Sequence, residues 1–92
     1  MNTKAKGSRN ERKTRHLLEA IGYNCCKAGA SLGMWDLVAI HETHIRLIQV
    51  KSNRRPPRLE METMQQFRNP PGSSKELWIW NDGERMPLVE VL

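Results

Sequence analysis

Three polar residues interrupt or end two neighbouring apolar runs, and they are of the types that phosphodiester chemistry uses. Asp36 lies within the run Met34 to Ile40, whereas Gln49 and Lys51 lie at the end of the run Ile45 to Val50. An aspartate disfavours β structure and is costly to bury, so its presence in an apolar strand indicates a function. The connection between the runs has the length of a hairpin loop. We therefore expect antiparallel strands that bring Asp36 beside Gln49 and Lys51.

A carboxylate, an amide oxygen and an ammonium group at one end of a sheet can serve a single reaction. Breaking a phosphodiester requires an activated water and neutralised phosphoryl oxygens, which a carboxylate-bound Mg²⁺ and a lysine supply. Mg²⁺ takes oxygen ligands and keeps several waters, so one or two carboxylates and a substrate phosphate hold it. Gln49 and Lys51 share one face of their strand because side chains alternate with a period of two. A salt bridge between Asp36 and Lys51 is the alternative explanation of these residues.

The composition indicates one small domain with an anionic partner. The chain has 92 residues, which predicts a single domain over residues 1–92 that would gain stability by oligomerising. Its net charge of +5 favours nucleic acid as the partner, although charge kept for solubility would look the same. No apolar run approaches the about 20 residues that cross a bilayer, and the N-terminus lacks a secretory core, so we expect a cytoplasmic protein without membrane contact. Neither a disulfide between the adjacent Cys25 and Cys26 nor a structural zinc site is indicated.

Capping and turn residues divide the chain into helices and strands. Residues 1–7 are predicted to form a flexible arm, and the capping-box pattern from Ser8 to Glu11 predicts the start of a basic amphipathic helix that ends at Gly22. Two adjacent prolines make Ser52 to Arg58 an extended connector. The other predicted elements are strands at 23–28, 34–40 and 45–50, a helix at 60–67 with apolar contacts from Leu59, Met61, Met64 and Phe67, and strands at 77–80 and 88–92.

Glu11, Asp36 and the triplet Gln49-Val50-Lys51 resemble the signature of the PD-(D/E)xK, or restriction-endonuclease-like, nuclease superfamily. The layout is similar to that of the small Holliday-junction resolvases of archaea and of stand-alone VRR-NUC domains of phages. The resemblance implies an α/β fold of order αβββαββ, in which helices flank a mixed β-sheet. It also implies that Asp36 binds metal, that position 49 completes the metal site, that Val50 lends its carbonyl, and that Lys51 activates or orients water.

Two positions depart from that signature. Trp35 stands in place of the proline, which is a weak departure because the proline is often absent. Gln49 stands in place of the acid, and its neutral amide oxygen should hold Mg²⁺ less tightly than a carboxylate. In resolvases a glutamate of the first helix contributes to the metal site, and Glu11 would compensate in that role. The capping box is an equally good explanation of Glu11.

Basic residues around Lys51 are candidates for contacts with the DNA backbone. The arginines of the connector follow Lys51 directly, a location that favours phosphate contacts over a solvated loop. Ser31, in the loop 29–33, resembles a resolvase serine that contacts phosphate, although turn chemistry also explains it. Trp78 and Trp80 share one strand face and are expected in the core rather than stacked on bases. The candidate DNA-binding residues are Ser31, Lys27, Arg9, Arg12, Arg54, Arg55 and Arg58.

These features predict a Mg²⁺-dependent endodeoxyribonuclease, with Mn²⁺ as a substitute ion, that is selective for branched DNA such as Holliday junctions. Asp36 and Glu11 would hold the metal with Gln49 and the Val50 carbonyl, and Lys51 would position the water. Family resemblance and small size imply a homodimer that presents two sites to a junction. The main alternative is a catalytically weak or inactive DNA-binding module of the same fold. A third alternative is a subunit that binds no DNA, and the positive net charge argues against it most strongly.

Overall fold

The computed structural model describes residues 3–28 and 33–92 of the chain. Its elements follow the predicted order of one helix, three strands, a second helix and two strands. Among these described residues, neither helix combines the length and the apolar character that crossing a membrane requires. In chain order the elements are α1 (Thr3–Ala20), β1 (Asn24–Lys27), β2 (Leu37–His41), β3 (His44–Ser52), α2 (Arg58–Gln66), β4 (Ser73–Trp80) and β5 (Leu88–Val91).

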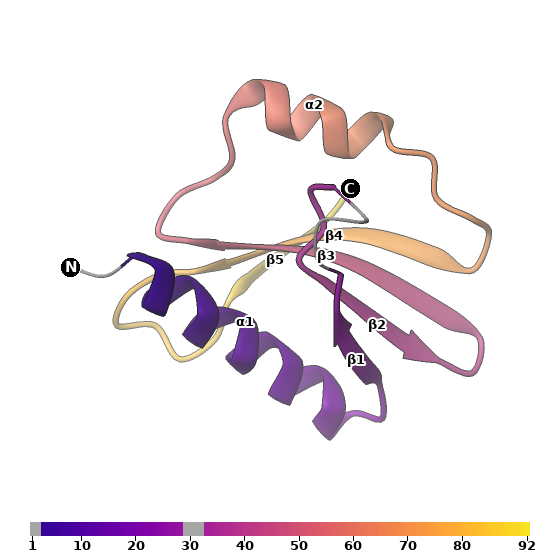
Figure 1. The fold of residues 1–92 in the computed structure, drawn as a ribbon, viewed down its shortest axis with the longest axis horizontal. Coiled ribbons are helices and arrows are strands. Elements are labelled where there is room, and N and C mark those ends of the chain that lie inside the picture. Colours follow the sequence, from indigo (N-terminus) through magenta and orange to yellow (C-terminus); the bar gives the residue numbers. More distant parts are fainter. Residues whose placement is uncertain (1–2, 29–32) are drawn as a thin grey trace.

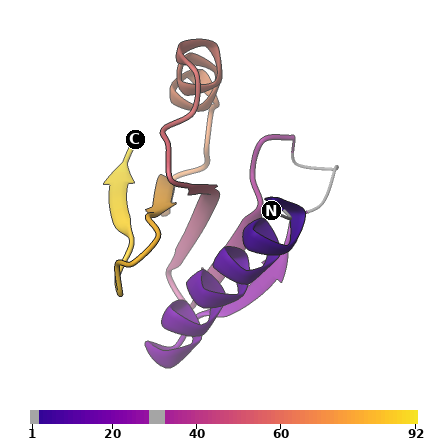
Figure 2. The ribbon, with the colours of Figure 1, turned by 90° about the vertical axis from the view of Figure 1, so that its left-hand side faces the viewer.

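The strands form one mixed sheet in the order β1-β2-β3-β4-β5. β3 and β4 are parallel, whereas all other neighbours are antiparallel. A parallel pair needs a crossover connection, and α2 lies in the connection between β3 and β4. Figures 1 and 2 show α1 and α2 on opposite faces of the sheet, so the predicted mixed sheet flanked by helices is confirmed.

Each helix packs on its own face of the sheet through a separate apolar cluster. Consecutive side chains of β3 alternate between the two faces, so Ile48 and Val50 face α1 whereas Leu47 faces α2. Gln49 and Lys51 therefore lie on the α2 face with Leu47. The cluster on the α1 side contains Leu18, Leu37, Ala39, Ile48, Val50, Trp78 and Trp80, and the cluster on the α2 side contains Trp35, Leu47 and Met64. The expected core positions of Trp78 and Trp80 are thus confirmed.

The N-terminal helix starts earlier than the sequence predicts. α1 begins at Thr3, so residues 3–7 are helical rather than a flexible arm, and the segment from Ser8 to Glu11 lies inside the helix instead of capping it. Lysine and alanine before Gly7 are good helix formers, and one glycine inside a helix costs only about 1 kcal/mol. The end at Gly22 is as predicted. Gly22 has φ +98°, and Tyr23 N–H donates to the Leu18 carbonyl across 3.0 Å.

The second helix and the strand after it also begin before their predicted starts. Leu59, in the first turn of α2, is 76 % exposed, so its predicted apolar contact is wrong. β4 begins at Ser73 because its polar residues have partners in the fold. Lys75 Nζ donates to the carbonyl of Gln65 at the end of α2 across 2.6 Å. Glu76 accepts a 2.9 Å bond from Trp78 Nε1.

A buried hydroxyl joins α1 to β4. Thr14 Oγ1 donates a 2.8 Å hydrogen bond to the Asn10 carbonyl and accepts one of 2.8 Å from Trp80 Nε1. Thr14→Val leaves the buried indole N–H without its acceptor. We therefore expect the free energy of unfolding, measured by urea denaturation, to fall by about 1–3 kcal/mol.

Thr63→Val is the matched control for this change. Thr63 makes the same kind of bond, of 2.9 Å, to the carbonyl one turn back, but on the exposed side of α2. Its loss should change the free energy of unfolding by no more than about 0.5 kcal/mol. Equal losses in the two variants would contradict a stabilising role for the bond to Trp80.

Candidate active site

Asp36 lies just before β2 and continues the pairing of β2 with β3 through its side chain. Its backbone N–H donates to the Ile48 carbonyl across 2.8 Å, and its Oδ2 accepts a 2.8 Å hydrogen bond from the Val50 N–H. Leu37 is paired with Ile48, so Asp36 lies opposite Gln49. The hairpin therefore brings Asp36 next to residues 49–50, as the two apolar runs predict.

The Val50 backbone lies beyond the last residue pair of the β2–β3 ladder. The N–H and C=O groups of one strand residue point toward the same neighbouring strand, so the Val50 carbonyl is directed to the side on which Asp36 lies. The Asp36 carboxylate takes up the N–H in place of a strand partner. This leaves an aspartate and a carbonyl oxygen at the same end of the sheet.

The charge state of Asp36 reflects both its burial and its neighbours. Burial raises the pKa of Asp36, and the negative charge of Glu60 adds to this effect. The Val50 N–H bond and the positive charges of Lys51 and Lys27 act in the opposite direction. Ionised Asp36 is thus costly in the fold unless a cation compensates it.

Glu11 reaches the same region from α1. Burial raises the pKa of Glu11, and the charge of Asp36 raises it further, whereas Lys27 lowers it. Lys27 Nζ lies 3.8 Å from Glu11 Oε1. Because Glu11 lies inside α1, it cannot serve as the capping residue. Its electrostatic coupling to Asp36 is the observation that connects Glu11 with the candidate site.

Gln49 and Lys51 differ in how their polar atoms are satisfied. Gln49 is 7 % exposed, and its buried Oε1 has no hydrogen-bond donor among the described residues. Lys51 Nζ lies 3.4 Å from Oε1 of Glu60 in the first turn of α2. Sequence reasoning did not single out Glu60, because its partner lies in a strand that no local pattern connects to α2.

The oxygen atoms at this end of the sheet are of the types that a hard divalent cation takes as ligands. Buried polar atoms are normally hydrogen-bonded, so the unpartnered Gln49 Oε1 is an oxygen still open to a ligand. Asp36 and Glu11 add carboxylates, and Val50 adds a carbonyl. No group of three or more His, Cys, Asp or Glu side chains in the described ranges could hold a metal by itself. The donor set therefore fits a Mg²⁺-type ion that keeps several waters rather than a closed protein cage.

A basic cleft of about 310 Å³ lies beside Glu11 between α1 and the β1–β2 edge. It contains two of the predicted DNA-binding residues, Arg12 and Lys27. It also contains Arg15, another arginine of α1. The spacing of positions 8, 11, 12 and 15 places them on one helix face. The lining residues are Ser8, Glu11, Arg12, Arg15, Lys27 and Leu37.

The other predicted DNA-binding residues do not extend this cleft. Arg55 forms a two-pronged ion pair with Glu90 of β5, at the opposite edge of the sheet from β1. Arg58 is paired with Glu62 across 3.1 Å. Arg54 is exposed, with no ion pair to a residue that the structure describes. Arg9 is exposed on α1, and Ser31 lies outside the described residues.

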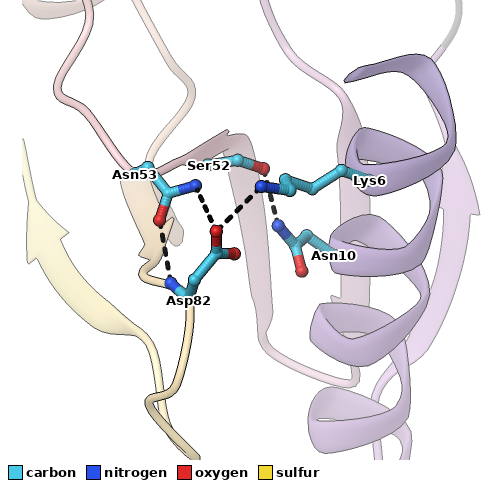
Figure 3. A network of polar contacts seen from close by, with 5 residues as sticks. All are labelled: Lys6, Asn10, Ser52, Asn53 and Asp82. Carbon is cyan, nitrogen blue, oxygen red and sulfur yellow. Dashed lines mark hydrogen bonds and ion pairs between the residues drawn. The ribbon is translucent and has the colours of Figure 1, made fainter. Parts of the chain in front are cut away.

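A polar network holds the backbone directly after Lys51 (Figure 3). Asn10 Nδ2 donates to Ser52 Oγ across 2.6 Å, which ties α1 to the end of β3. Asn53, with φ +65°, accepts a 2.8 Å bond from the Asp82 N–H and donates one of 3.2 Å to the Asp82 carboxylate. Lys6 Nζ binds the same carboxylate across 2.8 Å. Segments far apart in sequence thus fix the strand end that carries Lys51.

The comparisons with known proteins concern the family and the fold of the chain. The family described as archaeal Holliday junction resolvase (Hjc) matches residues 2–68. No match is found among curated proteins. The fold is similar to the solved structure of Archaeoglobus fulgidus Hjc, a Holliday junction resolvase from an archaeal hyperthermophile, with a TM-score of 0.68 and 21 % identity over 95 % of this chain and 71 % of that chain. By the extent of the family match, the chain belongs to the archaeal Holliday junction resolvase family, a family of nucleases.

Proposed function

We propose that this chain is a divalent-metal-dependent endodeoxyribonuclease that cleaves Holliday junctions. Mg²⁺ is the proposed ion, with Mn²⁺ as a substitute. The observation that carries the proposal is the 2.8 Å hydrogen bond from the Val50 N–H to Asp36 Oδ2, which joins the acid to the strand end bearing Gln49 and Lys51. Membership of a resolvase family supports the junction as substrate.

Each residue at the strand ends has a distinct proposed role. Asp36, Glu11, Gln49 Oε1 and the Val50 carbonyl would hold the ion, which when bound neutralises phosphoryl charge and activates water. Lys51 Nζ would orient the attacking water and stabilise negative charge on the phosphoryl group. Gln49 is buried and Asp36 is half-buried, so both side chains are partly shielded from solvent, which strengthens their interaction with a cation.

The DNA backbone is proposed to lie along the basic cleft beside Glu11. Arg12 and Lys27 line that cleft and would contact phosphates next to the acids. Exposed Arg9 and Arg54, and Ser31, are proposed phosphate contacts outside this cleft. Arg55 and Arg58 would first have to leave their ion pairs with glutamates, so we expect them to contribute less.

A homodimer is the proposed assembly. β5 is an edge strand with exposed Leu88 and Val91, and exposed Ile21 and Met86 adjoin an apolar groove of about 250 Å³ between α1 and β5. Exposed apolar area of this kind marks interaction surfaces. A second copy placed by two-fold symmetry would present two sites to the strands of one junction.

A catalytically weak DNA-binding module is the second candidate function. Two observations favour it: position 49 carries no charge, and Lys27 Nζ already lies 3.8 Å from Glu11. Both reduce the net negative charge available to a cation. Under this alternative the chain would bind junctions but would not cut them.

Cleavage of a labelled four-way junction separates these functions. We expect the chain to cut the junction in Mg²⁺ or Mn²⁺, to leave a linear duplex of the same sequence intact, and to lose cleavage but not binding in EDTA. Binding in all conditions without cleavage would select the weak module. Equal cleavage of both substrates would overturn selectivity for branched DNA.

A further inference from the structure

β3 carries Gln49 where the nuclease signature has an acid, and α2 presents the carboxylate of Glu60 to Lys51. Gln49 occupies the position from which an acid would share a strand face with Lys51. In the fold, Lys51 Nζ instead lies 3.4 Å from Glu60 Oε1 of α2. The Glu60 side chain is 43 % exposed and that of Lys51 is 27 % exposed, so the pair lies at the rim of the sheet where a substrate can reach it.

Glu60 is also electrostatically coupled to Asp36. Its negative charge contributes to raising the pKa of Asp36. Asp36, Lys51 and Glu60 therefore form one set of interacting charges, although Glu60 comes from the helix that covers this face of the sheet. Lys51 Nζ contacts the Glu60 carboxylate directly, and its charge acts on Asp36 as well, so the second carboxylate offsets the positive charge that Lys51 adds to the site.

The connection after β3 places Glu60 within reach of Lys51. The connector turns toward α2 immediately after the polar network at Ser52 and Asn53, and Pro56 in it is buried. The adjacent prolines restrict this segment, so the first turn of α2 returns over the strand end. Stabilisation of an acid by the N-terminal helix dipole would explain Glu60 without any role at the site. That explanation does not account for the 3.4 Å contact with Lys51.

The unpartnered amide at position 49 fits the same arrangement. Gln49 Oε1 is buried without a donor, so Gln49 does not hold Lys51 through this oxygen. A carboxylate at position 49 together with Glu60 would place two like charges near Asp36 on one face. A neutral residue at 49 avoids that repulsion when the acid comes from α2.

We propose that Glu60 supplies from α2 the carboxylate that β3 lacks at position 49, acting as the positioning residue of Lys51 and adding negative charge that favours the divalent ion. The inference rests on the proposed function. It assigns the charge missing at position 49 to a residue outside the strand hairpin. A carboxylate introduced at position 49 should therefore be able to replace the carboxylate of Glu60.

The test compares Glu60→Gln with Glu62→Gln in the full chain. Glu62 lies on the same helix, is 45 % exposed and is paired with Arg58 rather than with Lys51. Its change to glutamine removes one negative charge, as Glu60→Gln does, but away from the site. Two readouts are taken: Mn²⁺ affinity by calorimetry without DNA, and kcat at saturating four-way junction in Mg²⁺. We expect Glu60→Gln to lower both by about 10–100-fold, the range for residues that support a metal site, and Glu62→Gln to leave both unchanged.

A double variant tests whether the two positions are interchangeable. Gln49→Glu in the Glu60→Gln background should restore Mn²⁺ affinity and kcat toward the wild-type values, and thermal melting checks that every variant is folded. Identical behaviour of the Glu60→Gln and Glu62→Gln proteins, or no rescue by Gln49→Glu, overturns the inference while an active wild type preserves the proposed function. A wild type that neither binds Mn²⁺ nor cuts the junction overturns both.

Discussion

Lys51→Ala is expected to lower kcat for junction cleavage by about 10²–10⁴-fold, the range over which a positioned proton-transfer group contributes. Lys51 is the ammonium group that shares a strand face with Gln49 and contacts Glu60 across 3.4 Å, and its charge acts on Asp36. Removing it takes away the group proposed to orient the attacking water. The measurement is a single-turnover time course on a labelled four-way junction with the protein in excess.

Binding must be followed separately, because a lysine near DNA also contributes affinity. Junction binding in Ca²⁺, which occupies oxygen sites without supporting the reaction in many nucleases, should be retained by the Lys51→Ala protein. Lys13→Ala removes the same charge from α1, where Lys13 Nζ lies over the Trp80 ring at 5.2 Å from its centroid. Lys13→Ala should cleave at the wild-type rate. Wild-type cleavage by the Lys51→Ala protein, with or without metal, would exclude the nuclease mechanism proposed for this lysine.

Asp36→Asn is expected to abolish metal-dependent cleavage and to raise the thermal stability at neutral pH. Burial raises the pKa of Asp36 above its ordinary value of 3.8, so the folded state binds the proton more tightly than the unfolded state. The stabilising contribution of the protonated group is fully present below the unfolded pKa and is lost as pH rises through the folded pKa. At pH 7 the ionised carboxylate therefore destabilises the fold, and asparagine removes that charge while its oxygen can still accept the Val50 N–H bond.

Asp82→Asn provides a control with the opposite sign. The Lys6 hydrogen bond and ion pair lower the pKa of Asp82, so its contribution is present above the unfolded pKa and is lost as pH falls through the folded pKa. Asp82→Asn should thus lower the melting temperature at pH 7, whereas Asp36→Asn should raise it. Added Mg²⁺ should raise the melting temperature of the wild type and not that of the Asp36→Asn protein. A fall in both variants at pH 7 would contradict the assigned environment of Asp36.

A gain in stability on Asp36→Asn would identify Asp36 as a residue kept at a cost in stability. A buried acid whose pKa is raised by desolvation is a recurrent property of functional sites, because the charge that destabilises the fold is the charge that binds a cation. Gln49 Oε1 also carries a cost, because a buried oxygen without a hydrogen-bond donor destabilises the fold. At a position with a purely structural role we would expect this oxygen to have a donor.

Short-range patterns predicted most of the elements and the centre of the site. The two apolar runs and their hairpin-length connection were enough to place Asp36 beside residues 49–50, because a tight connection leaves antiparallel pairing as the natural outcome. Alternation along β3 was enough to place Gln49 and Lys51 on one face. The element boundaries were less accurate. At α1, helix-forming residues before Ser8 and the contact of Lys6 with Asp82 extend the helix past an apparent cap.

The sequence by itself determined the local chemistry of this protein: an acid that lies directly before one strand, a QxK triplet in the next, and the hairpin-length connection that brings them together. Only the tertiary structure decided which distant charges surround that pair. It directs Glu60 of α2 to Lys51, pairs Arg55 with Glu90 of β5, and brings Glu11 of α1 near Asp36. The reason is physical. Contacts within a hairpin follow from spacing and alternation over a few residues, whereas contacts between a helix and a sheet depend on the crossover, the packing of both faces and the polar network at the end of β3.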